Sequence, residues 1–358
     1  VPALDGQTVS GPEATGAKEV LDAGFDNVID FLQQYDTAHD VQLPVRYDLC
    51  VCASKDRAGH EASDVADWLK YVPGFEDDAK TPAMLTHPIT AISDDGSAVT
   101  PEILDQVLEN VKASDLYLIE HCEHHDTGAV NEGPVSRELG VPGIPEDTEL
   151  KIVARDIEAA RRTGVHVHFQ HVSTAISFEA IRKAKAEGLP ITCETAPHYL
   201  ALSDEALLKY GTLAKMNPPL RTKEDRQALL EGLKNDVFDV ISTDHAPHTM
   251  VEKGVSMKSA PFGIVGLETS VSLTITELVD KGWITPMQMA EKMSYNPAQI
   301  LHLTNKGSLK PGKDADVVVI DPKESYVIDV KDFVSKGKNT PFQGKKVNGK
   351  VKVTICGG

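Results

Sequence analysis

Short, β-prone apolar segments alternate with amphipathic helical stretches along most of the chain. The segments predicted as strands cover residues 45–53, 89–93, 116–119, 165–169, 191–194 and 237–243. Parallel strands need a crossover connection, so strands that alternate with helices predict a parallel sheet built from βαβ units. The pattern predicts an α/β fold of the TIM-like (β/α)8 barrel class. A doubly wound nucleotide-binding sheet is the alternative, but it requires a glycine-rich phosphate turn that this sequence lacks.

Side chains with acid–base and metal-binding chemistry follow four of these segments. They are Asp94, His121, His171 and Asp244. Barrel closure directs the carboxyl ends of the strands toward one axis, so residues far apart in sequence meet there. Taken singly, each histidine is more often a core or loop residue and each aspartate a cap. Together, imidazole and carboxylate ligands predict a site for one or two Zn²⁺ ions, with Mn²⁺ or Co²⁺ as substitutes.

A second pair of histidines, His166 and His168, lies inside a predicted strand rather than at its end. Side chains two residues apart in a strand share one face, and His171 falls on the opposite face of the pleat. We therefore interpret His166 and His168 as structural residues.

The alternation of strands and helices stops after Asn296-Pro297. Residues 316–320 and 345–355 are β-prone and lack helical spacing, which is typical of a small antiparallel module. We predict two domains, a (β/α) barrel over residues 1–305 and a C-terminal β-sandwich module over residues 306–358.

Composition excludes several classes of partner. The formal net charge is −18, which argues against nucleic acid and anionic membranes. No apolar run approaches the roughly 20 residues of a membrane span. The five cysteines form an odd, sparse set, which favours reduced thiols and a cytoplasmic location.

Several short motifs occur in the order found in a known family. The motifs are SDDG (93–96), HCE (121–123), NEG (131–133), QHVST (170–174), NPPLR (217–221), TDHAPH (243–248) and PFGIVGLET (261–269). They resemble type I dihydroorotase, a metal-dependent amidohydrolase. The C-terminal runs GKDADVVVID and NTPFQG resemble the β-sandwich of that family. The resemblance covers nearly the whole chain and implies the (β/α)8 barrel.

The resemblance also implies roles for the residues at the strand ends. His121 and His171 would hold one metal, Asp94 would bridge two metals, and Asp244 would contact the other metal and carry a proton. Asn217, His248, Phe262 and Gly263 would bind the substrate ring. Related hydantoinases bridge their metals with a carbamylated lysine, whereas the corresponding strand here ends in Asp94. The implied reaction is the reversible hydrolysis of the cyclic amide of dihydroorotate to N-carbamoyl-aspartate, a step of pyrimidine biosynthesis.

The sequence departs from the family pattern at its beginning. The family opens with a strand that ends in His-x-His followed by arginine, and with a second strand that ends in asparagine. Nothing upstream of Val1 supplies these residues or the N-terminal part of the sandwich. We expect that the chain is a fragment or that an upstream segment has been left out, and that these residues alone bind metal weakly and have poor or absent activity.

Two other functions are consistent with the sequence. The chain could be a catalytically impaired dihydroorotase-like scaffold that binds a partner such as a transcarbamoylase, or another cyclic-amide hydrolase of the hydantoinase, dihydropyrimidinase or allantoinase type. The expected ligand is a small molecule in each enzymatic case. A homodimer is the other predicted assembly.

Overall fold

The computed structural model describes residues 45–75, 87–123 and 128–358. The chain divides into two compact units, residues 1–121 and residues 122–358, which are described separately. The predicted domain boundary at residues 305 and 306 stays a prediction.

The first unit contains a parallel arrangement of three short strands. These are β1 (Leu49–Val51), β2 (Ile89–Ile92) and β3 (Tyr117–His121). Strand β2 pairs with both neighbours in parallel and is buried along its whole length. The helices are α3 (Val65–Trp68), a 3-10 turn (Leu69–Tyr71) and α4 (Leu104–Ser114), with a further 3-10 turn at Lys55–Arg57. Predicted strands at 89–93 and 116–119 are therefore correct within two residues.

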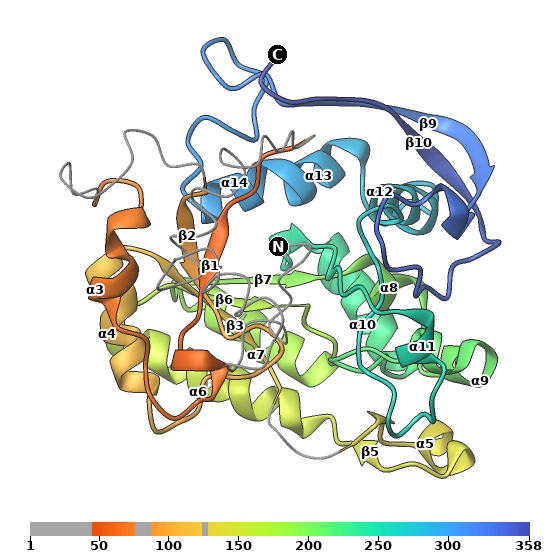
Figure 1. Cartoon of the computed structure of the whole chain (residues 1–358), viewed down its shortest axis with the longest axis horizontal. Helices are drawn as coiled ribbons and strands as arrows, with labels where there is room; N and C mark the ends of the chain where they lie inside the picture. The colour runs from red at the N-terminus through yellow and green to blue at the C-terminus, as the bar shows by residue number, and fades with distance from the viewer. Residues whose placement is uncertain (1–44, 76–86, 124–127) are drawn as a thin grey trace, which may run out of the picture. The chain divides into compact units, whose positions relative to one another are not determined.

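The second unit begins with alternating strands and helices. Their bounds are β4 (Val130–Asn131), α5 (Pro134–Leu139), β5 (Gly143–Ile144), α6 (Asp147–Thr163), β6 (Val167–Gln170), α7 (Ala175–Ala186), β7 (Ile191–Thr195), α8 (Pro197–Ala201), α9 (Ala206–Tyr210), a 3-10 turn (Gly211–Ala214), α10 (Lys223–Lys234), β8 (Val240–Ile241) and α11 (Met250–Lys253). The order follows the alternation predicted from the sequence (Figure 1).

Strands β6, β7 and β8 pair in parallel, and helices connect them. Val167 pairs with Ile191, and Glu194 pairs with Val240. Val167, Phe169 and Cys193 are fully buried, so their side chains form part of the core beneath the strand ends. Burial on both faces is typical of parallel strands covered by crossover helices.

The C-terminal part of the second unit consists of short helical segments and a long β-ribbon. The segments are α12 (Ser270–Thr274) with a π turn (Ile275–Val279), α13 (Pro286–Ala290) with a π turn (Glu291–Tyr295), α14 (Asn296–Ile300), β9 (Val317–Val327), a 3-10 turn (Val330–Asp332) and β10 (Lys346–Ile355). Strands β9 and β10 pair antiparallel, as the sequence predicts, and Figure 1 shows them side by side. Within the described residues, no helix is long and apolar enough to span a bilayer.

Candidate active site

Asp94 is held by the loop after β1 in the first unit. Its carboxylate oxygens accept hydrogen bonds from the Ser54 backbone N–H at 3.1 Å, and its Oδ2 also accepts one from the Ser54 hydroxyl. The side chain is buried, and this burial raises the pKa of Asp94 although the bonds from Ser54 oppose the shift. The carboxylate is therefore already engaged within its own unit.

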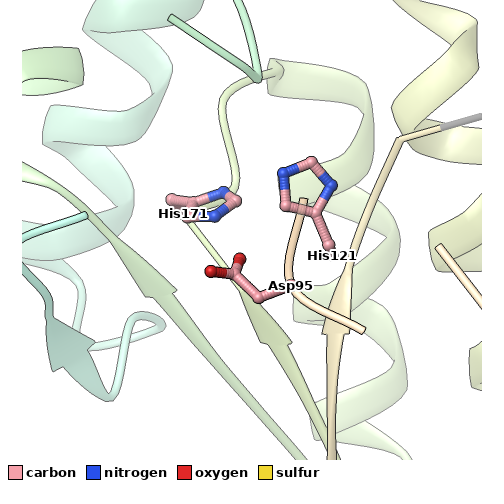
Figure 2. A group of neighbouring side chains, drawn as sticks. All are labelled: Asp95, His121 and His171. Carbon is pink, nitrogen blue, oxygen red and sulfur yellow. The ribbon is translucent and has the colours of Figure 1, made fainter. Parts of the chain in front are cut away.

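Asp95, the next residue, lies beside His121. One oxygen of Asp95 and one ring nitrogen of His121 lie within 4.8 Å of each other (Figure 2). A carboxylate and an imidazole at this separation fit a divalent metal ion between them. Sequence reasoning chose Asp94 from the Asp-Asp pair and missed Asp95, because adjacent residues after a strand cannot be distinguished by pattern. The role of Asp94 stays a prediction.

His171, also drawn in Figure 2, belongs to the second unit and follows β6. It is buried, and its backbone N–H donates to Glu194 Oε1 at 3.3 Å. The other oxygen of Glu194 contacts His168 Nε2 at 3.2 Å, and His168 Nδ1 contacts the Thr192 hydroxyl at 2.8 Å. His166 contacts the same hydroxyl at 3.0 Å. These contacts agree with a structural role for His166 and His168 below His171.

A buried carboxylate on α6 stabilises the turn after His171. Glu149 is fully buried and accepts hydrogen bonds from the backbone N–H groups of Ser173 and Thr174, both at 3.0 Å. The hydroxyls of the same two residues also donate to it. All four donors bond to the Glu149 carboxylate. These bonds hold the backbone of the turn that follows His171.

Asp244 follows β8 with an unusual backbone conformation. Its φ is 44°, in the left-handed region that residues other than glycine rarely adopt. Such strain occurs at functional positions that the surrounding structure enforces. Asp244 Oδ2 lies 3.5 Å from His198 Nε2. This contact brings together the residues that follow β7 and β8.

His198 is a candidate residue that sequence reasoning left out of the site. It is buried in α8, directly after β7, and burial together with the charge of His171 lowers the pKa of His198 to about 3. The ring is therefore neutral at neutral pH. Its position after a strand, in the run APH, was the signal that could have identified it.

Three of the motifs meet through Arg221. Its Nη1 donates to Asn131 Oδ1 at 3.0 Å, and its Nε donates to the Ser173 hydroxyl at 3.2 Å. Asn131 in turn donates to Asp204 at 3.3 Å. The runs NEG, QHVST and NPPLR are thus parts of one buried hydrogen-bond network.

Asn217 lies four residues before Arg221 and is joined to Pro218 by a cis peptide bond. Its side chain opposes the rise in the pKa of the nearby Glu123. Burial raises the pKa of Glu123 to about 7, and the nearby Arg221 charge opposes the rise. Glu123 was not predicted as a site residue, although it belongs to the HCE motif.

His248, Phe262 and Gly263 lie close together, and their role in substrate binding stays a prediction. His248 Nε2 contacts the Phe262 carbonyl oxygen at 2.7 Å. Gly263 has a φ of 117°, and a Cβ atom there would lie 2.4 Å from the Ala246 Cβ. Only glycine avoids both the steric contact and the strained backbone at this position.

The chain is similar to known proteins over most of its length. The model of the Amidohydrolase family matches residues 4–358. A protein named Dihydroorotase from Acetivibrio thermocellus is 44% identical over 309 residues, which cover 85% of this chain and 68% of the relative. A Dihydroorotase from Pelotomaculum thermopropionicum is 48% identical over 272 residues, covering 75% of this chain and 64% of the relative.

Solved structures with more distant sequences share the fold. A dihydropyrimidinase from Brevibacillus agri NCHU1002 superposes with a TM-score of 0.76 at 21% identity, covering 93% of this chain and 73% of that chain. A D-hydantoinase superposes with a TM-score of 0.75 at 22% identity, covering 92% and 73%. This similarity confirms the predicted α/β barrel fold. The chain spans about two thirds of the length of the relatives it matches, from 63% to 68% in the first three.

Proposed function

The chain belongs to the amidohydrolase family, and we propose that it acts as a dihydroorotase, interconverting dihydroorotate and N-carbamoyl-aspartate in pyrimidine biosynthesis. The observation that carries this proposal is the 44–48% identity to proteins named Dihydroorotase. Solved hydantoinases and dihydropyrimidinases are only 21–22% identical, apart from one at 26% over a shorter region. Relatives of higher identity therefore favour dihydroorotate over hydantoins as substrate.

Metal binding is the second part of the proposal. His121 and His171 would hold one metal ion, a carboxylate of the Asp94-Asp95 pair would bridge to a second ion, and Asp244 would contact that second ion. The ligand atoms of Asp95 and His121, which lie within 4.8 Å of each other, support a metal-binding role for these two residues. Zn²⁺ suits these ligands best, and Mn²⁺ or Co²⁺ are acceptable. When bound, the metal supplies an activated water molecule and polarises the ring carbonyl.

The chain's own residues would bind the substrate and move a proton. Asp244 would accept the proton of the attacking water and transfer it to the ring nitrogen that leaves. The 3.5 Å distance between Asp244 Oδ2 and His198 Nε2 supports a fixed orientation of the carboxylate. Asn217, His248, Phe262 and Gly263 would hold the substrate ring. The contact between His248 and the Phe262 carbonyl supports this assignment.

Two further expectations belong to this proposal. The enzyme would act in the cytoplasm. It would form a homodimer or bind a transcarbamoylase. The alternative, an impaired scaffold, is disfavoured by the presence of His121, His171 and Asp244, and a purely structural role would not require the strained backbone at Asp244.

An assay of carbamoyl-aspartate cyclisation at mildly acidic pH, and of dihydroorotate opening at alkaline pH, tests the proposal. Hydantoin and dihydrouracil serve as matched competing substrates. We expect turnover of dihydroorotate alone, and the Asp244→Asn enzyme should lose about 10²–10⁴-fold in kcat while keeping its fold. Turnover of hydantoin but not dihydroorotate would refute the substrate assignment. Unchanged kcat in the variant would refute the role of Asp244.

A further inference from the structure

Two buried lysines in the second unit lie close to the segment that carries Phe262 and Gly263. Lys253, the last residue of α11, is 1% exposed, and Lys215 is 2% exposed. Among the residues that the structure describes, neither ammonium group forms an ion pair with a carboxylate. A buried cation without a counter-charge is costly unless its hydrogen bonds are satisfied. The contacts of these two groups therefore require an explanation.

The Lys253 ammonium is satisfied entirely by backbone carbonyls. Its Nζ donates to the carbonyl oxygens of Lys215 at 3.0 Å, Pro261 at 2.8 Å and Gly263 at 2.9 Å. An ammonium group has three donors and no acceptor, so this arrangement uses its full capacity. Because the three carbonyls come from two segments, Lys253 ties residues 261–263 to the segment that leads to Asn217.

Lys215 reinforces the same connection. Its Nζ donates to the Ala260 carbonyl at 2.6 Å and lies 4.3 Å from the centroid of the Phe262 ring, a cation–π distance. Its backbone carbonyl accepts from Gly263 N–H at 3.0 Å as well as from Lys253. The backbone of Gly263 is therefore bonded through both its N–H and its C=O.

The remaining contacts of this segment are also polar. The Phe262 carbonyl contacts His248 Nε2 at 2.7 Å. The Gly263 carbonyl accepts a second bond, from Asn339 Nδ2 at 3.1 Å, and Asn339 also donates to the Ala246 carbonyl at 3.0 Å. Every carbonyl from Pro261 to Gly263 thus has a defined donor. The conformation of the segment depends on this set of donors, with Lys253 at its centre.

We propose that Lys253 is a positioning residue for the substrate: its ammonium group fixes the Pro261–Gly263 backbone in the conformation that binds the substrate ring. The inference rests on the proposed function, because that function assigns Phe262 and Gly263 to substrate binding. Lys253 does not touch the substrate itself. Its positive charge also favours a ligand that carries a carboxylate, in a chain whose net charge is −18.

The geometry has a consequence for pH dependence. Burial, together with the positive charge of Lys215, lowers the pKa of Lys253 to about 8, and burial lowers the pKa of Lys215 to about 8. The other charged groups nearby are engaged elsewhere, since Glu252 caps α11 through Thr249 and His248 contacts Phe262. Above pH 8 Lys253 loses its charge and one of its three donors. The segment should then loosen and substrate affinity should fall.

The test compares Lys253→Met with Lys258→Met in the whole enzyme. Methionine keeps the length of the side chain and removes the ammonium group. Lys258 lies five residues further along the chain, in the segment after α11, and is exposed, so it is a matched control. Two quantities are measured: the hydrogen-exchange protection of the Gly263 amide without substrate, and KM and kcat for dihydroorotate between pH 7 and 9.5.

We expect Lys253→Met to lose about tenfold in Gly263 protection and to raise KM by about tenfold with a smaller change in kcat, because the charged donor of three bonds is lost while Asn339, His248 and Lys215 still hold the segment. In the unsubstituted enzyme, KM should rise above pH 8 and Gly263 protection, corrected for the intrinsic exchange rate, should fall. Equal protection in the two lysine variants would overturn the inference, and so would a flat pH response of the unsubstituted enzyme. The pH response is measured on the unsubstituted enzyme, so it does not depend on whether a variant folds. Absence of dihydroorotate turnover in the unsubstituted enzyme refutes the proposed function, whereas Gly263 protection still tests Lys253.

Discussion

Replacing Glu149 with alanine should destabilise the second unit strongly. The fully buried carboxylate accepts four hydrogen bonds, two from backbone N–H groups and two from the hydroxyls of Ser173 and Thr174. Removal of the carboxylate leaves the four donors without this acceptor, around a small cavity. A hydrogen bond to a charged acceptor contributes about 1.5–3 kcal/mol, but water entering the cavity satisfies part of the loss. We expect a decrease of about 4 kcal/mol in the free energy of unfolding.

The measurement is thermal unfolding followed by circular dichroism. For a unit of this size, 1 kcal/mol lowers Tm by about 2–4 °C, so Glu149→Ala should lower Tm by about 10 °C. Glu158→Ala is the matched control, because Glu158 lies on the same helix and its partner Arg161 is solvent-exposed. Its Tm should remain close to that of the unsubstituted protein. If Glu149→Ala unfolds at the same temperature as the control, the four contacts do not support the turn after His171.

The same substitution should also weaken metal binding, because the turn that Glu149 holds follows His171 directly. Loss of a group that orients a metal ligand typically costs about 10–100-fold in metal affinity. Competition with a fluorescent zinc chelator measures this loss at a temperature where both variants are folded. Unchanged zinc affinity in Glu149→Ala would separate the stability of this turn from any metal role of His171.

Three other predictions concern the metal, the core and the substrate segment. Removal of metal with a chelator should abolish dihydroorotate turnover, and Zn²⁺, Mn²⁺ or Co²⁺ should restore it; turnover that survives chelation would contradict the metal proposal. Burial lowers the pKa of His166 to about 4 from its ordinary 6.5, so the unfolded state binds a proton first and stability should fall as pH decreases from 6.5 toward 4. Denaturant midpoints of His166→Gln should depend less on pH across that window, and equal slopes would refute this account. Gly263→Ala should raise KM for dihydroorotate by about tenfold or more because of its positive φ and the contact with Ala246, whereas Gly282→Ala, in open space, should leave KM unchanged.

The positions of most strands could be predicted because a buried parallel strand requires a short apolar run. Segments 89–93, 116–119, 165–169 and 191–194 correspond to β2, β3, β6 and β7 within two residues. The strand predicted at 237–243 is shorter, since β8 covers only Val240–Ile241. The antiparallel pairing of β9 and β10 also followed from the sequence, because both segments are β-prone and lack helical spacing.

The candidate site was predicted in part. Asp244, His248, Phe262 and Gly263 were identified by motif, and the last three lie together in the second unit. Asp95 was not predicted, because no local pattern shows which of two adjacent carboxylates lies near His121; in the structure Asp94 bonds to Ser54, 40 residues earlier, and Asp95 lies beside His121. His198 was missed because its significance depends on its 3.5 Å distance to Asp244 on the next strand.

The amino-acid sequence by itself determined the fold class, the order of the strands and the kinds of side chain at their ends. This is because buried strands and amphipathic helices each require a local hydrophobic pattern. Only the tertiary structure decided which donors meet which acceptors. Lys253 is one of several lysines in the sequence, and it acquires its three carbonyl partners because α11 folds against residues 215 and 261–263. Hydrogen bonds depend on distance and direction between segments far apart in the chain, and no local pattern specifies these quantities.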